Sequence, residues 1–552
     1  MNVNENLAKV AVVGLGPRGL GALEALGERL LRDGRRMSVD VFDPASFPGA
    51  GPNFCPEESP LCLLNIPIRD IAIRPPSFST CGRFADWLDQ TPDPDSFPTR
   101  ADLGRYLQAR LTDVCGLDIM PVTLHPQCVE QIEPCADGWK LNTGGRWFGP
   151  YAEVLLTLGQ PRTEADEQLA DWTRHAQRSG LHLADAYPAR RLEDLAQGWQ
   201  GQTAAIRGLA LSSFDVCRAL TSAQGGQFQA QGYIPSGREP KRIIAFSLDG
   251  KPPFAKPETE QIDARFEPMA AETKVFVSAL DQAASSTPEA AAEVINAAVA
   301  PVVIRILDIP PASDGADEIM EWLQTEWSAP STQETGSPRD ILRRGIELAE
   351  GKWPPTIGYS VGQIWRKWQD AFRAGFNPAA VSAETAKAIV GFDEGLKRYS
   401  YGPPVSSARE MEALIEAGIL DLSFATDPDI DLSETGWRLS SGDATVEAAI
   451  MIDAVLPSPD LSAVIAPLVP DLIDSGLLQP VAAGLAAQTA ADGRVFDQQG
   501  APVPGLCLLG RLALGSVIAV DSLHDCFGEA TSRWAAGVLA RIAAGAQPVE
   551  PN

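Results

Sequence analysis

Three glycines near the amino terminus have the type and spacing to do chemistry. Gly14, Gly16 and Gly19 form the pattern G-x-G-x-x-G, after the apolar run K-V-A-V-V-G and before a stretch with helical character. The first glycine permits a tight turn, the second lets the backbone approach a pyrophosphate, and the third lets helix and strand pack closely. The amino terminus of the helix then faces the phosphates with free N–H groups. The pattern predicts a dinucleotide site.

The element after this helix supplies the second part of such a site. The run S-V-D-V-F-D reads as a strand that ends at Asp43, where a carboxylate accepts hydrogen bonds from a ribose. Strand, glycine turn, helix and strand together make one βαβ unit. A glycine turn can serve packing alone, but the two strands and Asp43 favour nucleotide binding.

Three later features favour FAD as the nucleotide. Gly49 and Gly51 lie just past the second strand, where the backbone comes close to the cofactor a second time. A later buried strand ends at Gly159, and the run L-C-L-L-G ends at Gly510 and leads to Asp521 and a final helix. A remote helix that closes on the amino-terminal site suits a long cofactor with two phosphates, although each glycine taken singly also fits a plain turn.

A second βαβ unit has a turn that departs from the glycine pattern. It reads Gly208-Leu-Ala210-Leu-Ser-Ser213, and its small residues still admit a nicotinamide dinucleotide, but they also fit a degenerate domain kept for its fold. The next strand ends without an acidic residue, and Arg238 and Arg242 lie just before or within it. A missing ribose carboxylate with guanidinium groups nearby predicts NADPH rather than NADH. A solvated basic loop is the alternative.

The order of these elements predicts an α/β fold with two Rossmann-like dinucleotide-binding domains and a helical insertion. The 552 residues are too many for one ordinary core. A tryptophan-rich stretch at 320–370 reads as ordinary core, with a lid or an oligomer face as alternatives. The expected parts are the first portion of the FAD domain (1–202), the NAD(P)H domain (203–315), a helical insertion or substrate region (316–440), and return strands with the end of the FAD domain (441–552).

Composition excludes several classes of function. A net charge of −27 makes nucleic acid and anionic membranes poor partners, and no stretch is apolar enough to span a bilayer. The opening residues lack the pattern of a secretory leader, so we expect a cytoplasmic protein. Nine cysteines without C-x-x-C argue against a redox-active dithiol, and four histidines without metal-ligand spacing predict no metal.

One stretch imitates a different enzyme class. Gly358-Tyr-Ser360-Val-Gly362 matches the nucleophile elbow of α/β-hydrolases, and His524 is the one plausible late histidine for a triad. The elbow must follow a buried strand, but paired prolines precede this stretch. We interpret Ser360 as a helix cap instead.

The chain resembles the flavoproteins with two dinucleotide-binding domains. More narrowly, it is similar to a bacterial FAD/NAD(P)-binding family that includes L-aspartate N-hydroxylases of the nitrosuccinate type. The resemblance covers most of the chain and is specific for the cofactor architecture. The similar stretches are G-L-G-P-R-G-L (14–20), F-D-P…F-P-G-A-G (42–51), L-L-N-I-P (63–67), F-P-T-R-A-D-L-G-R-Y-L (97–107), I-R-G-L-A-L-S-S-F-D-V (206–216) and Y-G-P-P-V-S-S-A-R-E-M-E-A-L-I-E-A-G-I-L (401–420).

The resemblance implies a flavin-dependent NADPH oxidoreductase that inserts oxygen from O2 on the nitrogen of a small amine or amino acid. It places L-L-N-I-P near the flavin, with Asn65 as a cofactor contact. Arg69 and Arg74 follow this stretch and are candidates to hold a substrate carboxylate, although each alone also fits a surface arginine. A flavin oxidase or dehydrogenase without oxygen insertion, and a non-catalytic flavin-binding protein, stay open. So do the side chain over the flavin and a homo-oligomer.

Overall fold

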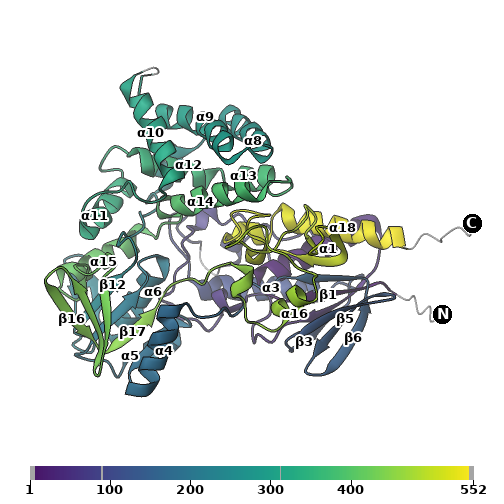
Figure 1. The fold of residues 1–552 in the computed structure, drawn as a ribbon, viewed down its shortest axis with the longest axis horizontal. Coiled ribbons are helices and arrows are strands. Elements are labelled where there is room, and N and C mark those ends of the chain that lie inside the picture. Colours follow the sequence, from purple (N-terminus) through teal and green to yellow (C-terminus); the bar gives the residue numbers. More distant parts are fainter. Residues whose placement is uncertain (1–6, 89–90, 311–312, 546–552) are drawn as a thin grey trace, which may run out of the picture.

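The computed structural model describes residues 7–88, 91–310 and 313–545. Two parallel sheets lie at the lower left and lower right of Figure 1, and a helical part lies above them. The predicted α/β fold with two Rossmann-like domains and a helical insertion is confirmed. Residues 1–6, on which part of the expectation about a leader rests, lie outside the described residues.

The first sheet has six strands and is built from both ends of the chain. Its order is β18 (Arg494–Phe496), β19 (Pro502–Leu508), β7 (Glu153–Leu156), β1 (Lys9–Val13), β2 (Ser38–Phe42) and β3 (Val122–His125). All neighbours are parallel except the β18–β19 pair. The central strands are nearly continuous apolar runs, because helices cover this sheet and leave its centre no wet face.

Helices from opposite ends of the chain cover this sheet together. Helix α1 (Pro17–Asp33) contacts α17 (Leu523–Cys526) and α18 (Glu529–Gly545), and α18 lies beside it in Figure 1. Helix α3 (Arg100–Cys115) also packs against α1. A small antiparallel sheet lies below this sheet and consists of β4 (Gln131–Cys135), β5 (Gly138–Thr143) and β6 (Arg146–Tyr151).

The second sheet has five parallel strands. Its order is β13 (Leu420–Asp421), β12 (Arg242–Phe246), β9 (Thr203–Arg207), β17 (Ile450–Asp453) and β8 (His182–Asp185). Around it lie α4 (Glu167–Ser179), α5 (Ala189–Ala196), α6 (Leu211–Leu220) and α15 (Val405–Glu416), with the strands β14 (Asp429–Ser433), β15 (Gly436–Ser441) and β16 (Ala444–Ala448). The short pair β10 (Gln227–Gln229) and β11 (Gly232–Ile234) follows α6.

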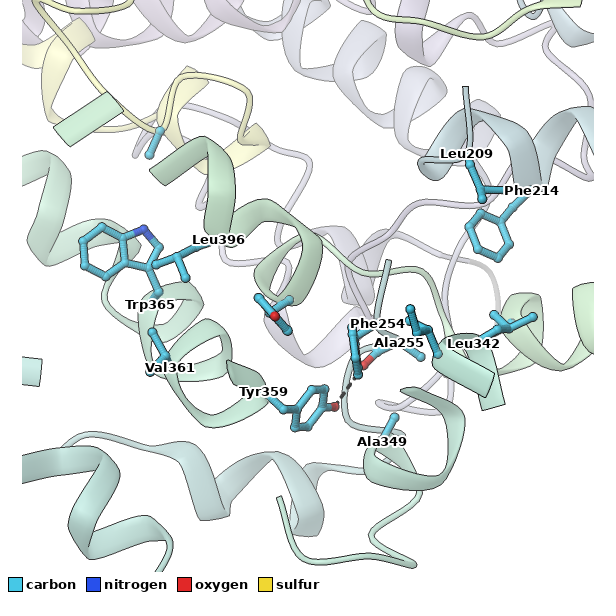
Figure 2. Close-up of a cluster of buried hydrophobic side chains, with 14 of the residues drawn as sticks. Leu209, Phe214, Phe254, Ala255, Leu342, Ala349, Tyr359, Val361, Trp365 and Leu396 are labelled. Carbon is cyan, nitrogen blue, oxygen red and sulfur yellow. Dashed lines mark hydrogen bonds between the residues drawn. The ribbon is translucent and has the colours of Figure 1, made fainter. Parts of the chain in front are cut away.

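The helical part packs around buried aromatic side chains. Trp365 and Trp368 are almost fully buried, and Figure 2 shows Trp365, Tyr359 and Phe254 within one apolar cluster. Trp353, at 59% exposure, is the exception in the stretch that we interpreted as core. The helices are α7 (Glu260–Asp263), α8 (Ala270–Ala284), α9 (Pro288–Ile306), α10 (Asp314–Ser328), α11 (Pro338–Ala349), α12 (Ile357–Lys367), α13 (Gln369–Phe376) and α14 (Ala383–Ser400).

The parts divide the chain differently from the expected boundaries. The helical part begins with α7 at Glu260, ahead of the expected start at 316, and α8 and α9 belong to it. Strand β8 belongs to the second sheet although it lies within 1–202, and β17 does so although it lies within 441–552. A buried parallel strand reads the same in either sheet, so its sequence does not say which neighbour it pairs with.

The stretch that imitates a nucleophile elbow lies inside a helix. Ser360 is fully buried within α12, and the element before α12 is the helix α11, not a strand. Our interpretation of Ser360 as the cap is wrong by one turn, since the side chain of Thr356 caps α12 by accepting a hydrogen bond from the Tyr359 amide. The prolines before it lie in the loop that leads to this cap.

In the part of the chain that the structure describes, no helix combines the length and the apolar character needed to cross a bilayer. The same residues contain no group of three or more potential metal-ligating side chains. The cytoplasmic location and the homo-oligomer stay predictions.

A glycine in α1 tests the packing between the two ends of the chain. A Cβ atom at Gly21 would lie 1.9 Å from the Cys526 carbonyl oxygen, whereas one at Gly391 in α14 would meet no atom within 4 Å. We expect Gly21→Ala to lower the free energy of unfolding by about 1–3 kcal/mol, because backbone must move. Gly391→Ala should be neutral or stabilise by up to about 1 kcal/mol. Urea unfolding measures both, and equal effects would contradict the packing.

Candidate functional site

The first glycine turn has the close backbone contacts that its motif predicts. Gly14 has a φ of +95°, and a Cβ atom there would lie 2.4 Å from the Thr157 carbonyl oxygen. A Cβ atom at Gly19 would lie 2.4 Å from the Gly14 oxygen, so helix and strand meet without room for a side chain. Thr157 Oγ1 donates a 2.6 Å hydrogen bond to that same oxygen. The turn therefore holds the amino terminus of α1 against the carboxyl edge of the first sheet.

Asp43, Gly49 and Gly51 lie on this turn. The Asp43 carboxylate accepts hydrogen bonds from the Leu15 amide and, at 2.7 Å, from the Ala45 amide. A Cβ atom at Gly51 would lie 3.2 Å from the Gly16 Cα. The structure thus brings these residues together, and it gives Asp43 a role in shaping the turn. Ribose binding by Asp43 stays a prediction.

Gly159 and Gly510 lie at the same edge of the first sheet. Gly159 follows β7, with a φ of +64° and no atom within 4 Å of a Cβ placed on it. Gly510 follows β19, and a Cβ atom there would lie 2.7 Å from Arg18 Nε. Open space at Gly159 beside a turn without side chains is a cradle that fits an extended dinucleotide.

Asp521 has another role than closing this cradle. Its carboxylate accepts hydrogen bonds from Lys397 Nζ at 2.8 Å and from an Arg511 guanidinium nitrogen at 2.6 Å. Burial alone would raise the pKa of Asp521, but the two cations outweigh burial and lower it to about 2. The side chain therefore ties the helical part to the first domain as an ionised bridge.

The second turn keeps the backbone shape of the first despite its different residues. Gly208 has a φ of +112°, and Ala210 precedes α6 with φ −95° and ψ −160°, close to the −81° and −166° of Gly16 before α1. Ser213 is fully buried and donates a 2.7 Å hydrogen bond to the Ala210 oxygen. The change from glycine to alanine and serine therefore preserves the backbone shape of the first turn.

The structure does not bring Arg238 and Arg242 to Gly208, which corrects our argument for them. Arg242 is the first residue of β12, and its Nε donates a 2.9 Å hydrogen bond to Asp421. Arg238 is exposed and precedes the strand. Gly208 lies at the carboxyl edge, where parallel strands bind nucleotides, and both arginines lie at the opposite edge. The carboxyl end of β12 lies at the same edge as Gly208, and there the side chain of Leu248, not an arginine, is 86% exposed.

A cavity of about 290 Å³ lies between the segment after L-L-N-I-P and the helices α13, α17 and α18. Its lining includes Ala72, Arg373, His524, Asp525 and Gly528. The Asp525 carboxylate forms a 2.6 Å ion pair with Arg18, inside the G-x-G-x-x-G motif. Burial lowers the pKa of His524, so its ring is uncharged at neutral pH. The Arg18–Asp525 pair therefore links the cavity to the glycine turn, and the lining contains charged and polar groups.

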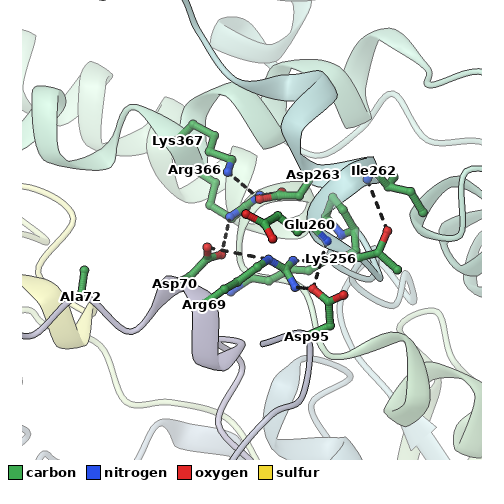
Figure 3. A network of polar contacts seen from close by, with 12 residues as sticks. Arg69, Asp70, Ala72, Asp95, Lys256, Glu260, Ile262, Asp263, Arg366 and Lys367 are labelled. Atoms are coloured by element: carbon green, nitrogen blue, oxygen red, sulfur yellow. Dashed lines mark hydrogen bonds and ion pairs between the residues drawn. The ribbon is translucent and has the colours of Figure 1, made fainter. Parts of the chain in front are cut away.

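A buried charged network borders this cavity through the segment after L-L-N-I-P (Figure 3). Arg69 pairs with Asp95 and donates a 3.3 Å hydrogen bond to the Pro257 oxygen. Lys256 Nζ donates to the Asn65 carbonyl oxygen, and His524 Nε2 lies 2.8 Å from the Asp70 carbonyl oxygen. Arg69 and Asn65 are thus inner residues of this network.

Arg74, the other predicted anchor, lies apart from Arg69. Its side chain is exposed, and its carbonyl oxygen accepts a 3.3 Å hydrogen bond from Arg110. Carboxylate binding by Arg69 and Arg74, and cofactor contact by Asn65, stay predictions.

Sequence reasoning missed Arg18, Thr157, Asp525 and Lys256. Arg18 lies inside the glycine motif, and a cation at that position was a signal available from the sequence. Asp525 and Lys256 have no spacing relative to other charged residues that would single them out. Their partners are more than 190 residues away, so only the folded chain reveals them.

Residues 11–161 match a family model described as FAD-NAD(P)-binding. This part of the chain is an FAD/NAD(P)-binding domain. Three curated relatives match most of the chain. Nitrosuccinic acid synthase of Aspergillus oryzae is 27% identical and the alignment covers 89% of this chain and 86% of that protein. The nitrosuccinate-forming L-aspartate N-monooxygenases of Streptomyces davaonensis and Streptomyces cremeus are 28% and 27% identical, and cover 85% of this chain and 85% and 82% of their own.

Solved structures with a similar course of the chain have lower identities. Reduced ornithine hydroxylase from Pseudomonas aeruginosa is 13% identical with a TM-score of 0.47, covering 97% of this chain and 100% of that one. FAD-bound cadaverine monooxygenase from Erwinia amylovora is 11% identical with a TM-score of 0.46, covering 99% and 97%. The FAD/NAD(P)-binding domain and the curated relatives confirm the predicted class, a flavin-dependent oxidoreductase.

The ion pair beside the glycine turn can be broken on one side. In Asp525→Asn, Arg18 would stay buried without its carboxylate, and removing one partner of a buried pair costs about 3–5 kcal/mol. We expect a loss of stability of this size in urea unfolding and weaker retention of FAD on gel filtration. Asp171→Asn removes an exposed partner of Arg174, and its effect should stay below about 1 kcal/mol. Equal losses in both variants would contradict a special role for the buried pair.

The corrected position of Arg242 gives a second prediction. Because Arg242 lies at the edge of the second sheet opposite Gly208, Arg242→Ala should leave the ratio of flavin reduction rates with NADPH and NADH within about twofold of the wild-type ratio. Stopped-flow flavin absorbance measures both rates. A marked loss of preference for NADPH would restore Arg242 as a phosphate contact.

Proposed function

We propose that the chain is an FAD- and NADPH-dependent monooxygenase that hydroxylates the amine nitrogen of a small acidic amino acid, with O2 as co-substrate. The curated relatives named as L-aspartate N-monooxygenases support this reaction, because they match along 85% of the chain rather than in the nucleotide domain alone. The observation that carries the proposal is the cavity of about 290 Å³ tied to the glycine turn through Arg18 and Asp525.

The two turns divide the cofactors between the two sheets. Gly14, Gly16 and Gly19, with the free amides of α1, would hold the FAD pyrophosphate, and the turn at Gly208 would hold the nicotinamide nucleotide. Bound there, NADPH supplies hydride and FAD supplies the oxygen-activating chemistry. NADPH rather than NADH remains part of the proposal, on the ground that β12 ends at Phe246 and Ser247 without a ribose-binding carboxylate at that position.

The cavity suits a free amino acid. Its volume is at the lower end for small-molecule sites, so it excludes large substrates. An amine attacks through its lone pair, so the ammonium form must lose its proton before reaction. The uncharged His524 ring adds no second positive charge beside the amine and can accept a hydrogen bond from it. Arg373 and Arg533 are the cations of the lining, and Arg373 is held by its 2.5 Å ion pair with Asp370 and by a 3.2 Å hydrogen bond to the Ala519 oxygen.

The purified protein should be yellow and release FAD on denaturation. We expect L-aspartate to stimulate NADPH oxidation under air at least tenfold over L-asparagine, which has similar size but an uncharged side chain, and tenfold corresponds to about 1.4 kcal/mol. Mass spectrometry should show gain of oxygen on the amine nitrogen.

Other outcomes would assign the protein differently. Hydrogen peroxide as the sole product across a panel of amines would replace the monooxygenase by an oxidase. A protein that binds FAD but oxidises no NADPH, with or without any amine of the panel, would favour the non-catalytic flavin-binding protein.

A further inference from the structure

Lys256 is a buried cation with an unfilled capacity for hydrogen bonds. Lys256 is 7% exposed. Among the described residues its Nζ donates a hydrogen bond to one acceptor, the Asn65 carbonyl oxygen. An ammonium group has three N–H donors, and a buried charge is stable only when it is paired or fully hydrogen-bonded. No carboxylate of the described residues forms an ion pair with it.

The nearby carboxylates are engaged by other cations. Asp263 pairs with Arg366 and, at 2.5 Å, with Lys367. Asp70 accepts a 3.3 Å hydrogen bond from Arg366. Figure 3 shows these pairs around Lys256, and the Lys256 Nζ donates to the Asn65 carbonyl oxygen instead. In the part of the chain that the structure describes, Lys256 is therefore left without a carboxylate of its own.

Arg69 contributes a second unfilled donor beside Lys256. Its Nε is buried and has no hydrogen-bond partner among the described residues, although it lies 3.9 Å from an Asp70 carboxylate oxygen and its other nitrogens bind Asp95 and the Pro257 oxygen. Pro257 directly follows Lys256, so the two cations are neighbours. Two buried donors in one place suit a carboxylate, which accepts up to four hydrogen bonds.

This position lies next to the cavity. The segment that contains Arg69 continues to Ala72 and Ile73, which line the cavity, and His524 joins the lining to the Asp70 carbonyl oxygen. We propose that Lys256 and Arg69 bind a carboxylate of the acidic amino-acid substrate, so that Lys256 determines specificity for a second negative charge. The inference rests on the proposed function for the identity of the substrate.

The arrangement makes anion binding depend on pH. Burial, followed by the charge of Arg366, lowers the pKa of Lys256 to about 7. A bound carboxylate favours the ammonium form and raises that pKa, so above about pH 7 the free protein must take up a proton when the anion binds. The charged and titratable groups that face Lys256 are Arg69 and Asp70 after L-L-N-I-P, Asp263 at the end of α7, Arg366 on α12, and His524 on α17.

Succinate tests this inference without catalysis, because it keeps both carboxylates of aspartate, has no amine to oxidise, and does not titrate above about pH 7. Titration calorimetry on the FAD-loaded protein, from about pH 6.5 to about pH 8.5, gives Kd and proton uptake. We expect Kd to rise about tenfold per pH unit above the pKa of Lys256, with uptake of about one proton. Lys256→Met should bind at least tenfold more weakly at the lowest pH and lose the dependence on pH.

Controls separate charge from folding. Lys140→Met, an exposed lysine of β5, should behave as the wild type, and Arg69→Gln should weaken binding while keeping the dependence on pH. A Kd of the wild type that does not change with pH would overturn the inference even if Lys256→Met fails to fold. Product from L-aspartate together with such a flat Kd defeats the inference alone. The expected succinate profile without any hydroxylated amine defeats the proposed function alone.

Discussion

The buried ion pair between Arg18 and Asp525 is the contact on which the arrangement of the site depends. Arg18 also donates hydrogen bonds to the carbonyl oxygens of Val520 and Asp525. The carboxyl-terminal segment therefore supplies both the ion-pair partner and the hydrogen-bond acceptors of this guanidinium. A guanidinium does not lose its proton, so it stays charged when buried and needs those partners. The amino-terminal glycine turn therefore folds stably only with the last helices in place. The same contact sets α17 against Gly21 and Asp525 against the cavity.

Charges at the junctions between the parts follow the same rule with one exception. Asp521 joins Arg511 of the first domain to Lys397 of the helical part, and Asp263 is held by two cations of α12. Each of these carboxylates has its pKa lowered by its partners although burial opposes this. Lys256 differs because its pKa is lowered by burial, and no carboxylate within residues 7–88, 91–310 and 313–545 forms an ion pair with it. A buried cation that no carboxylate of the described residues pairs with, close to a small cavity, is the feature on which the inferred anion site rests.

The two nucleotide turns show how far local sequence can be interpreted. Backbone shape is shared although Gly16 becomes Ala210 and Gly19 becomes Ser213, because the turn needs a positive φ only at its first residue and small side chains after it. The departure from the motif was therefore visible in the sequence, but only the structure showed that the backbone shape of the turn is kept. The argument from Arg238 and Arg242 failed for a related reason. It used nearness along the chain, whereas nucleotide contacts in a parallel sheet depend on which end of the strand a residue occupies.

The sequence by itself determined the βαβ units, the glycine turn with Asp43, Gly49 and Gly51, and the class of cofactor, because these depend on local spacing and on runs of apolar residues. It could also predict that a late glycine and helix return to the first domain. Only the tertiary structure decided which sheet β8 and β17 join, that Asp521 is a bridge, and that Lys256, Arg69 and His524 meet beside one cavity. These outcomes come from pairings across hundreds of residues, and a charged side chain shows its partner only after the chain has folded around it.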